Sequence, residues 1–233
     1  MTPRFPHFVP VADHALLVEL GEEVSERLSQ QVLALDHAIA ATPPLGVQEV
    51  VPALVNLLVE FDPLVTDHDA LQASLVDLLQ TVANIRIPVT THQVDICYDS
   101  DLSPDLNAVA STLDVSIDTV INAHLGSKFR VGMYGFAPGY AYLTGLDPML
   151  NLPRKSTALR DVPAGSVIIA GPQCLVTTLT MPTGWSILGR SPTQILRHSE
   201  DHPFLFNVGD HVRFNRIDRA TYEAHLRGEA SHG

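Results

Sequence analysis

Basic residues are scarce in this sequence. It has 14 lysines and arginines against 26 aspartates and glutamates, which gives a formal net charge of −12. A chain this acidic lacks the positive surface that binds phosphate backbones, so we expect no nucleic acid as a partner. For the same reason we expect no membrane partner, because anionic lipid surfaces attract basic segments.

Long apolar runs are also absent. No run reaches the roughly 18 residues that span a bilayer, and three prolines interrupt the first 20 residues, which is unlike a signal peptide. We therefore expect a cytoplasmic protein. The sequence contains no G-x-x-x-x-G-K-[ST], G-x-G-x-x-G, G-x-S-x-G or H-E-x-x-H motif. Any nucleotide site would then be unconventional or shared with another chain.

Metal ligands are sparse as well. The two cysteines, Cys97 and Cys174, lie in apolar runs without metal-ligand spacing. We expect buried thiols, with a disulfide or a nucleophile as the alternatives. His198 and His202 in "HSEDH" are four residues apart and allow a metal site, but the stretch is more typical of a solvated loop. We predict no metal site and no biotin attachment site in this chain.

The N-terminal part has the pattern of a small α/β unit. Residues 15–20 predict a strand, and apolar residues spaced by four and three predict a helix over about 24–39. Two strand-like runs within 47–61, parted at Pro52, precede a second helix for which Asp67 is the expected N-cap. The order β-α-β-β-α is typical of a ferredoxin-like sandwich.

The pattern changes near residue 90. A short helix is expected after Ser103-Pro104 and another at about 116–125. Glycine and proline then punctuate many short β-rich runs, which favours a β-barrel or a sandwich. We therefore expect an α+β fold with two domains, residues 1–90 and 91–233.

One segment, "GFAPGYAYLTGLDP" (135–148), combines glycines with aromatic rings. Glycine permits positive φ and close approach to a ligand, and the rings offer flat surfaces. The segment therefore indicates a binding loop, with a glycine-rich barrel corner as the structural alternative. The residues concerned are Gly135, Phe136, Pro138, Gly139, Tyr140, Tyr142 and Gly145.

Arginines gather in the loops that follow. Arg154, Lys155 and Arg160 lie within 152–166, and the only tryptophan, Trp185, precedes Arg190. Arginine suits planar recognition of a carboxylate or phosphate, so these loops predict a concave site for a small acidic ligand. Surface solubility is the alternative for Lys155 and Arg160.

One histidine lies close to this segment in the sequence. His124 shares the apolar face of its helix with Ile117 and Val120, which favours a structural role. Proton transfer is the alternative, because a neutral imidazole is available at pH 7.

The long stretch "GFAPGYAYLTGLDPMLNLPRKSTALRDVPAGSVIIAG", Gln173 and "PTGWSILGRSP" resemble the allophanate hydrolase subunit 1 family. That family includes the B subunit of bacterial ATP-dependent 5-oxoprolinase and KipI-type inhibitors of a histidine kinase. The resemblance covers roughly residues 8–215. It implies a small α/β domain followed by a cyclophilin-like β-barrel.

The resemblance also implies partners and a cofactor. Family members act with a homologous second subunit, which is subunit 2 in allophanate hydrolase and the C subunit in 5-oxoprolinase. In 5-oxoprolinase a third subunit joins the pair. The resemblance therefore implies ATP use by a complex, with this chain as one of its subunits.

The sequence departs from the family pattern beside these motifs. Pro172 stands where the family has glycine, Cys174-Leu175 replaces threonine-glycine, and Thr183 replaces the first of two glycines. Residues 95–99 also replace the usual proline-valine-x-tyrosine-glycine. 5-Oxoproline, urea and allophanate therefore all remain alternatives as substrate.

Our first hypothesis is a hydrolase subunit that acts on carbon–nitrogen amide bonds within a complex. The expected catalytic residues are His124, Arg154 and Arg190. The expected substrate-binding residues are Phe136, Pro138, Gly139, Tyr142, Ser166, Gln173 and Trp185. The second hypothesis is a KipI-type protein that binds and inhibits a histidine kinase. Prolyl isomerisation is a third, which rests on barrel class alone.

Overall fold

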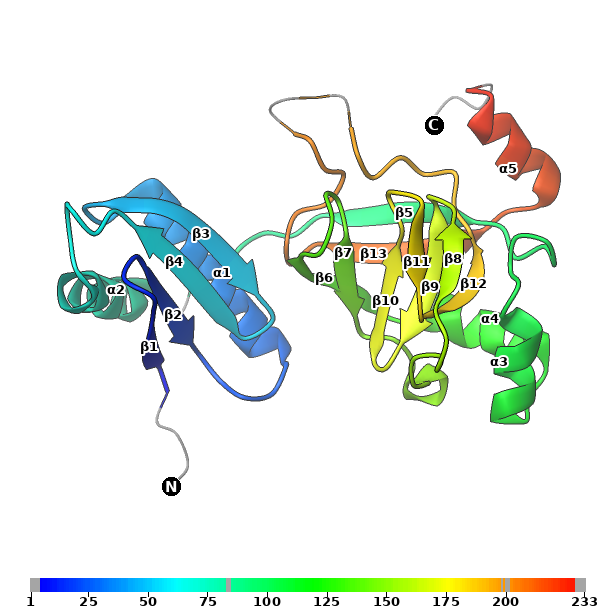
Figure 1. The fold of residues 1–233 in the computed structure, drawn as a ribbon, viewed down its shortest axis with the longest axis horizontal. Helices are drawn as coiled ribbons and strands as arrows, with labels where there is room; N and C mark the ends of the chain where they lie inside the picture. Colours follow the sequence, from blue (N-terminus) through cyan, green and yellow to red (C-terminus); the bar gives the residue numbers. More distant parts are fainter. Residues whose placement is uncertain (1–4, 83–84, 198, 200–201, 229–233) are drawn as a thin grey trace. The chain divides into compact units, whose positions relative to one another are not determined.

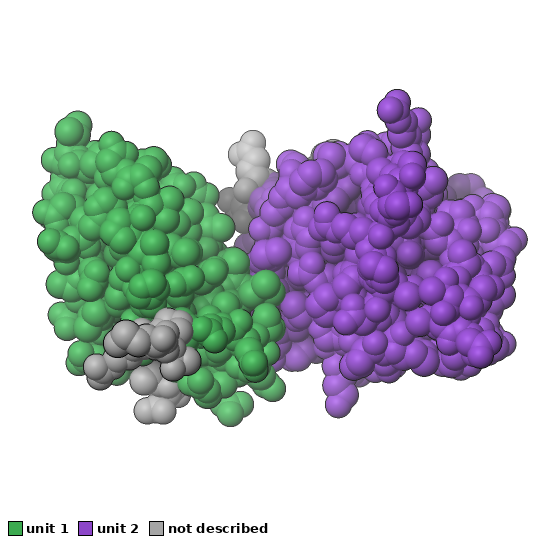
Figure 2. All heavy atoms as spheres, turned by 60° about the horizontal axis from the view of Figure 1, so that its bottom comes forward, with its two compact units in different colours: residues 1–89 green, residues 90–233 purple. Residues whose placement is uncertain are grey.

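The computed structural model describes residues 5–82, 85–197, 199 and 202–228. The chain divides into two compact units, Met1–Val89 and Thr90–Gly233, which Figures 1 and 2 show. His198 of the "HSEDH" stretch lies outside the described residues. The fold is mixed α and β with mostly antiparallel strand pairing.

Unit 1 is an antiparallel sheet covered by two helices (Figure 1). The strand order is β1 (His7–Val11), β2 (Ala15–Glu19), β4 (Asn56–Phe61) and β3 (Val47–Ala53). The helices are α1 (Glu26–Ala41) and α2 (His68–Val82). Both helices contribute to the same apolar cluster as alternate residues of β2 and β4, so they cover one face of the sheet.

The helices of unit 1 begin where the sequence predicts. Ser25 Oγ accepts the backbone N–H of Leu28, 3.3 Å away, and Asp67 Oδ1 accepts that of Ala70 at 2.9 Å. Such caps satisfy backbone donors that a helix start leaves unpaired. Asp67 is therefore confirmed as a cap.

The first strand, β1, was not predicted from the sequence. Pro6 and Pro10 obscure its alternation, because proline lacks the N–H that a central strand needs. The strand lies at the edge of the sheet, with Pro10 opposite Leu16 of β2. An edge position tolerates proline because one side of the strand has no partner.

Unit 2 contains a ladder of strands that returns to its start. β5 (Thr91–Ile96) runs parallel to β13 (His211–Arg216), and β13 pairs antiparallel with β6 (Phe129–Tyr134). The antiparallel ladder continues through β7 (Ala141–Thr144), β10 (Gln173–Val176), β9 (Ser166–Ala170) and β12 (Ser186–Arg190). Cys97, which follows β5, exchanges two backbone hydrogen bonds of 2.8 and 2.9 Å with Arg190 of β12.

The apolar residues of unit 2 form two clusters on opposite faces of β9. Val167 and Ile169 belong to the interior cluster, which also takes in α3 (Leu106–Leu113) and α4 (Ile117–Gly126). Ile168 and Ala170 belong to a second cluster, to which β8 (Leu159–Val162) and β11 (Met181–Thr183) contribute as a two-stranded sheet. β9 is therefore buried on both faces. The remaining elements are η1 (Pro148–Leu150) and α5 (Arg219–Leu226).

Both cysteines are free and buried, which confirms the expectation for them. Among the described residues, none of the helices combines the length and the apolar character needed to cross a bilayer. Within the same ranges, no three histidine, cysteine or acidic side chains are grouped as a metal site would require.

Candidate functional site

A small cavity of about 160 Å³ lies against the second apolar cluster of unit 2. We call it the aromatic pocket. Five residues predicted to form a site line it: Phe136, Tyr140, Tyr142, Arg154 and Trp185. The other described lining residues are Ile168, Leu175, Pro182, Thr183 and Gly184.

The floor of the aromatic pocket follows from strand alternation. Ile168 of β9 and Leu175 of β10 are register partners and line the cavity. The residues beside them, such as Ile169 and Cys174, belong to the interior cluster. Because successive side chains of a strand point to opposite faces, the packed interior fixes where the floor residues lie.

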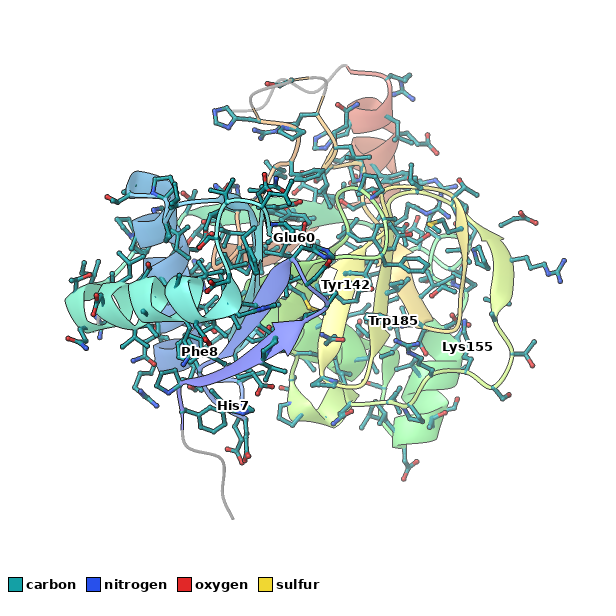
Figure 3. All side chains as sticks on the ribbon, turned by 60° about the vertical axis from the view of Figure 1, so that its left-hand side comes forward. His7, Phe8, Glu60, Tyr142, Lys155 and Trp185 are labelled. Carbon is teal, nitrogen blue, oxygen red and sulfur yellow. The ribbon has the colours of Figure 1, made fainter. Side chains whose placement is uncertain are left out.

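Arg154 brings a positive charge to the pocket and lies over the ring of Trp185. The Arg154 guanidinium carbon lies 5.7 Å from the centroid of the Trp185 ring. The rings of Tyr142 and Trp185 meet edge to face, with centroids 5.9 Å apart. A cation over an aromatic face contributes about 0.5–1 kcal/mol at an exposed site. Figure 3 shows Tyr142 and Trp185 on this unit.

The loop that carries Arg154 is held at the next residue, Lys155 (Figure 3). The Lys155 backbone N–H donates to the Gly184 carbonyl at 2.7 Å, and Nζ lies 2.6 Å from Asp105 Oδ2. The same Asp105 oxygen accepts the backbone N–H of Ile187 at 2.8 Å. Asp105, just before α3, therefore joins the loop to β12.

Phe136 stands at the rim of the pocket in a strained conformation. Its φ is +70°, a region that side chains other than glycine rarely adopt, and the residue is 75% exposed. Its ring centroid is 5.7 Å from that of Tyr140, which is almost fully buried. Burial, and secondarily the nearby Tyr142, raises the pKa of Tyr140. Strain of this kind is often found at functional sites.

Pro138 and Gly139 belong to the same loop but do not line the cavity. The Pro138 carbonyl accepts the Thr178 hydroxyl at 2.6 Å. Gly139 has φ of +75°, and a Cβ there would lie 3.0 Å from Thr178 Cγ2. Both residues therefore shape the loop.

Ser166 and Gln173 also lie outside the lining. Ser166 has no exposed surface, and its hydroxyl donates to the Pro163 carbonyl at 2.7 Å. Its backbone N–H is 2.9 Å from the Thr177 hydroxyl oxygen, so it holds a turn together. Gln173 is half-buried at the start of β10, opposite Ala170.

Arg190 lies at the junction of β12 with the end of β5. Its backbone pairs with Cys97, and its Nε is buried without a hydrogen-bond partner among the described residues. Its register partner is Ser166. It is not a lining residue, so Arg154 and Arg190 are not brought together at the aromatic pocket.

His124 is fully buried in the interior of unit 2. Its Nδ1 lies 2.7 Å from the Tyr98 hydroxyl, and its Nε2 lies 3.5 Å from Cys174 Sγ. Burial lowers the pKa of His124 to about 3, which keeps the imidazole neutral at pH 7. With no exposed surface and no place in the lining, His124 has the environment of the structural role, not of proton transfer to a ligand.

Sequence reasoning missed most of the pocket's apolar wall. The apolar runs within Ser166–Ala170 and Gln173–Val176 lack polar alternation, which is the signal of a strand buried on both faces. That signal predicts apolar surroundings on the second face of these strands, where Ile168 and Leu175 lie. It does not identify that environment as a cavity.

A second cavity, of about 660 Å³, lies within unit 1. It is lined by residues that flank the start of α1, including Glu22, Glu23 and Arg27. None of the residues predicted to form a site lies there.

Comparisons with known proteins give a consistent assignment. A family model described as carboxyltransferase domain, subdomain C and D, matches residues 6–206. The B subunit of 5-oxoprolinase from Bacillus subtilis (strain 168) is 31% identical over 236 residues, which cover 97% of this chain and 98% of that protein. These matches confirm the resemblance to the group that contains allophanate hydrolase subunit 1 and the B subunit of 5-oxoprolinase.

Solved structures with a similar fold are also found. The crystal structure of TTHA0988 matches with a TM-score of 0.76 at 34% identity, over 88% of this chain and 40% of that one. The K. lactis urea amidolyase matches with a TM-score of 0.75 at 19% identity, over 95% of this chain and 16% of that one, which is a likeness of fold. Because the family model covers most of its residues, the chain belongs to the family of carboxyltransferase domains, subdomains C and D.

Proposed function

We propose that this chain is a subunit of an ATP-dependent complex that hydrolyses a carbon–nitrogen amide bond, and that it corresponds to the B subunit of 5-oxoprolinase. The observation that carries the proposal is the 31% identity to a protein of that name over nearly the whole of both chains. Three curated relatives bear this name, and none of the three is named as a kinase inhibitor. The KipI-type alternative is therefore not retained.

In this proposal the aromatic pocket receives the small amide substrate. Its volume is well below the roughly 300–1,000 Å³ of pockets for drug-sized ligands. Of the lining residues that the structure describes, Arg154 alone carries a formal charge, so it would hold the substrate's carboxylate. We propose that the chain binds and orients the substrate, while acid–base groups come from partner subunits.

Neither cavity described above fits ATP. The aromatic pocket is too small for a nucleoside triphosphate. In the cavity of unit 1, Glu22 and Glu23 outweigh the charge of Arg27 among the described lining residues, so the cavity would repel phosphates. ATP would bind elsewhere in the complex.

The remaining proposals concern the domains, the partners and the cellular location of the chain. We propose that the two units are domains, with a ferredoxin-like first and a cyclophilin-like barrel second. The strand order β1-β2-β4-β3 and the return of the ladder to β5 support these descriptions. The proposed partners are a homologous second subunit and a third oxoprolinase subunit, in the cytoplasm.

The test is ADP release by the chain purified together with its native partners. 5-Oxoproline, urea or buffer alone is added to the intact complex with ATP. Release that depends on 5-oxoproline is the expected result. No substrate-dependent release from an intact complex would refute the proposed function.

A further inference from the structure

Two neighbouring cations of the pocket loop have different surroundings. Lys155 is paired with Asp105 at 2.6 Å, and both side chains are largely buried. Arg154 is exposed and has no carboxylate within ion-pair distance among the described residues. Although the chain has 26 acidic residues, none of the described ones pairs with Arg154, so its N–H donors are available to another anion.

The described residues that line the pocket are mostly uncharged. They include no aspartate or glutamate, and Arg154 is the only charged residue among them. The other polar side-chain groups of the lining include the hydroxyls of Tyr140, Tyr142 and Thr183. A small anion would therefore meet a local positive charge in a protein whose net charge is −12.

The geometry of Arg154 suits two contacts at once. A guanidinium that lies over an aromatic ring keeps the N–H donors of its edge free, and these donors match a carboxylate. Tyr142 and Trp185, which meet edge to face, add aromatic faces against which a planar group can pack. The pocket therefore offers a guanidinium group for an anion and aromatic rings for a planar group within a small volume.

From these observations we infer that the aromatic pocket by itself, without partner subunits or ATP, binds a small carboxylate whose remainder is a planar ring or amide. The carboxylate is held by Arg154 and the planar part packs against Trp185 and Tyr142. The inference deepens the proposed function and rests on it for the choice of 5-oxoproline as probe.

The single tryptophan makes the binding measurable in the full chain. Trp185 is the only tryptophan and lines the pocket, so its fluorescence reports on this site. The chain is titrated with 5-oxoproline and with 2-pyrrolidinone, which has the same lactam ring without the carboxylate. We expect saturable binding of 5-oxoproline, and binding of the neutral lactam that is at least about tenfold weaker.

The matched variants are Arg154→Met and Arg160→Met. The first removes the charge and keeps an apolar side chain, whereas Arg160 is an exposed arginine of β8 outside the lining. We expect Arg154→Met to weaken 5-oxoproline binding at least about tenfold and Arg160→Met to leave it unchanged. Circular dichroism and the melting temperature show whether each variant is folded.

Three results would overturn the inference: no saturable signal with 5-oxoproline, equal affinity for the neutral lactam, or equal binding by folded Arg154→Met. The ADP-release assay separates this failure from failure of the proposed function. A complex that hydrolyses 5-oxoproline although the free chain does not bind it leaves the function standing. A chain that binds the carboxylate, in a complex without substrate-dependent ADP release, leaves the inference standing.

Discussion

At the scale of single residues, His124 shows how burial bears on the two roles that the sequence suggests, structural support and proton transfer. It is a neutral imidazole enclosed by aromatic rings, with Phe214 at 4.6 Å and Phe129 at 5.3 Å between centroids. Its two ring nitrogens meet Tyr98 and Cys174. Such a group stabilises the fold only while it stays uncharged.

The depressed pKa of His124 predicts a pH dependence of stability. Its folded pKa is about 3 and the ordinary value is 6.5, so the unfolded chain binds the extra proton between these pH values. Stability contributed by the neutral form is therefore present above about pH 6.5 and is lost as pH falls toward 3, by at most about 1.4 kcal/mol per pH unit. Urea unfolding of the wild type between pH 7 and pH 4 measures it.

The control for this prediction is His124→Gln, which keeps polar atoms without a titrating ring. We expect the variant to be less stable at pH 7 by about 1–3 kcal/mol, because the Tyr98 hydroxyl loses a well-placed partner. Its stability is expected to fall less steeply with pH. Equal slopes for wild type and variant would show that His124 does not titrate as described.

Two glycines of unit 2 form a matched pair for testing backbone geometry. Gly145 has φ of +89° and Gly171 has φ of +54°, so alanine costs roughly 1–2 kcal/mol of conformational strain at either position. A Cβ at Gly145 would also collide with the Lys128 carbonyl oxygen, whereas nothing lies within 4 Å at Gly171 among the described residues. We expect Gly145→Ala to lower the melting temperature clearly more than Gly171→Ala. Equal losses would contradict the described approach of backbone to backbone.

At the scale of elements, the Asp105–Lys155 pair connects the pocket loop to α3 and β12. Asp105 Oδ2 meets both Lys155 Nζ and the Ile187 N–H. Asp105→Asn keeps an oxygen for Ile187 but removes the charge opposite Lys155, and Lys155→Met removes the other partner. A double-mutant cycle from urea unfolding is expected to give a coupling of about 0.5–3 kcal/mol. A coupling near zero would mean that the pair does not hold the loop.

The elements also show what the sequence can predict. Helix α1 follows from apolar spacing, α2 follows from apolar spacing and the Asp67 cap, and the interior strands follow from short β-rich runs. The position of Arg190 cannot be predicted from the sequence. The motif that contains it does not indicate on which face of β12 the side chain lies. Ser166 and Arg190 are register partners at one end of the β9–β12 ladder, away from the pocket lining. Only strand pairing reveals that.

The pocket itself could be predicted in part. Phe136, Tyr142, Arg154 and Trp185 were expected at a site because flat rings and arginine recur in the loops of this region. Thr183 and Gly184 belong to a stretch that carries the family resemblance, but their place in the lining depends on the pairing of β11 with β8, which no local pattern encodes. The apolar floor was missed for the same reason, since it depends on which strands become neighbours.

At the scale of the whole molecule, an acidic chain contains in unit 2 a pocket whose described lining includes Arg154 and no carboxylate. Similarity over nearly the whole chain supports a role with partner subunits, and the pocket supplies a place for a small carboxylate in unit 2. The two units divide between Val89 and Thr90, next to the change of composition near residue 90. The central claim is that this pocket serves the reaction of the complex.

The most direct measurement is the KM for 5-oxoproline of the purified complex, with wild-type chain and with Arg154→Met. We expect Arg154→Met to raise KM at least about tenfold, because substrate binding loses a charged partner, and Arg160→Met to leave KM unchanged. An intact Arg154→Met complex with wild-type KM and kcat would contradict it.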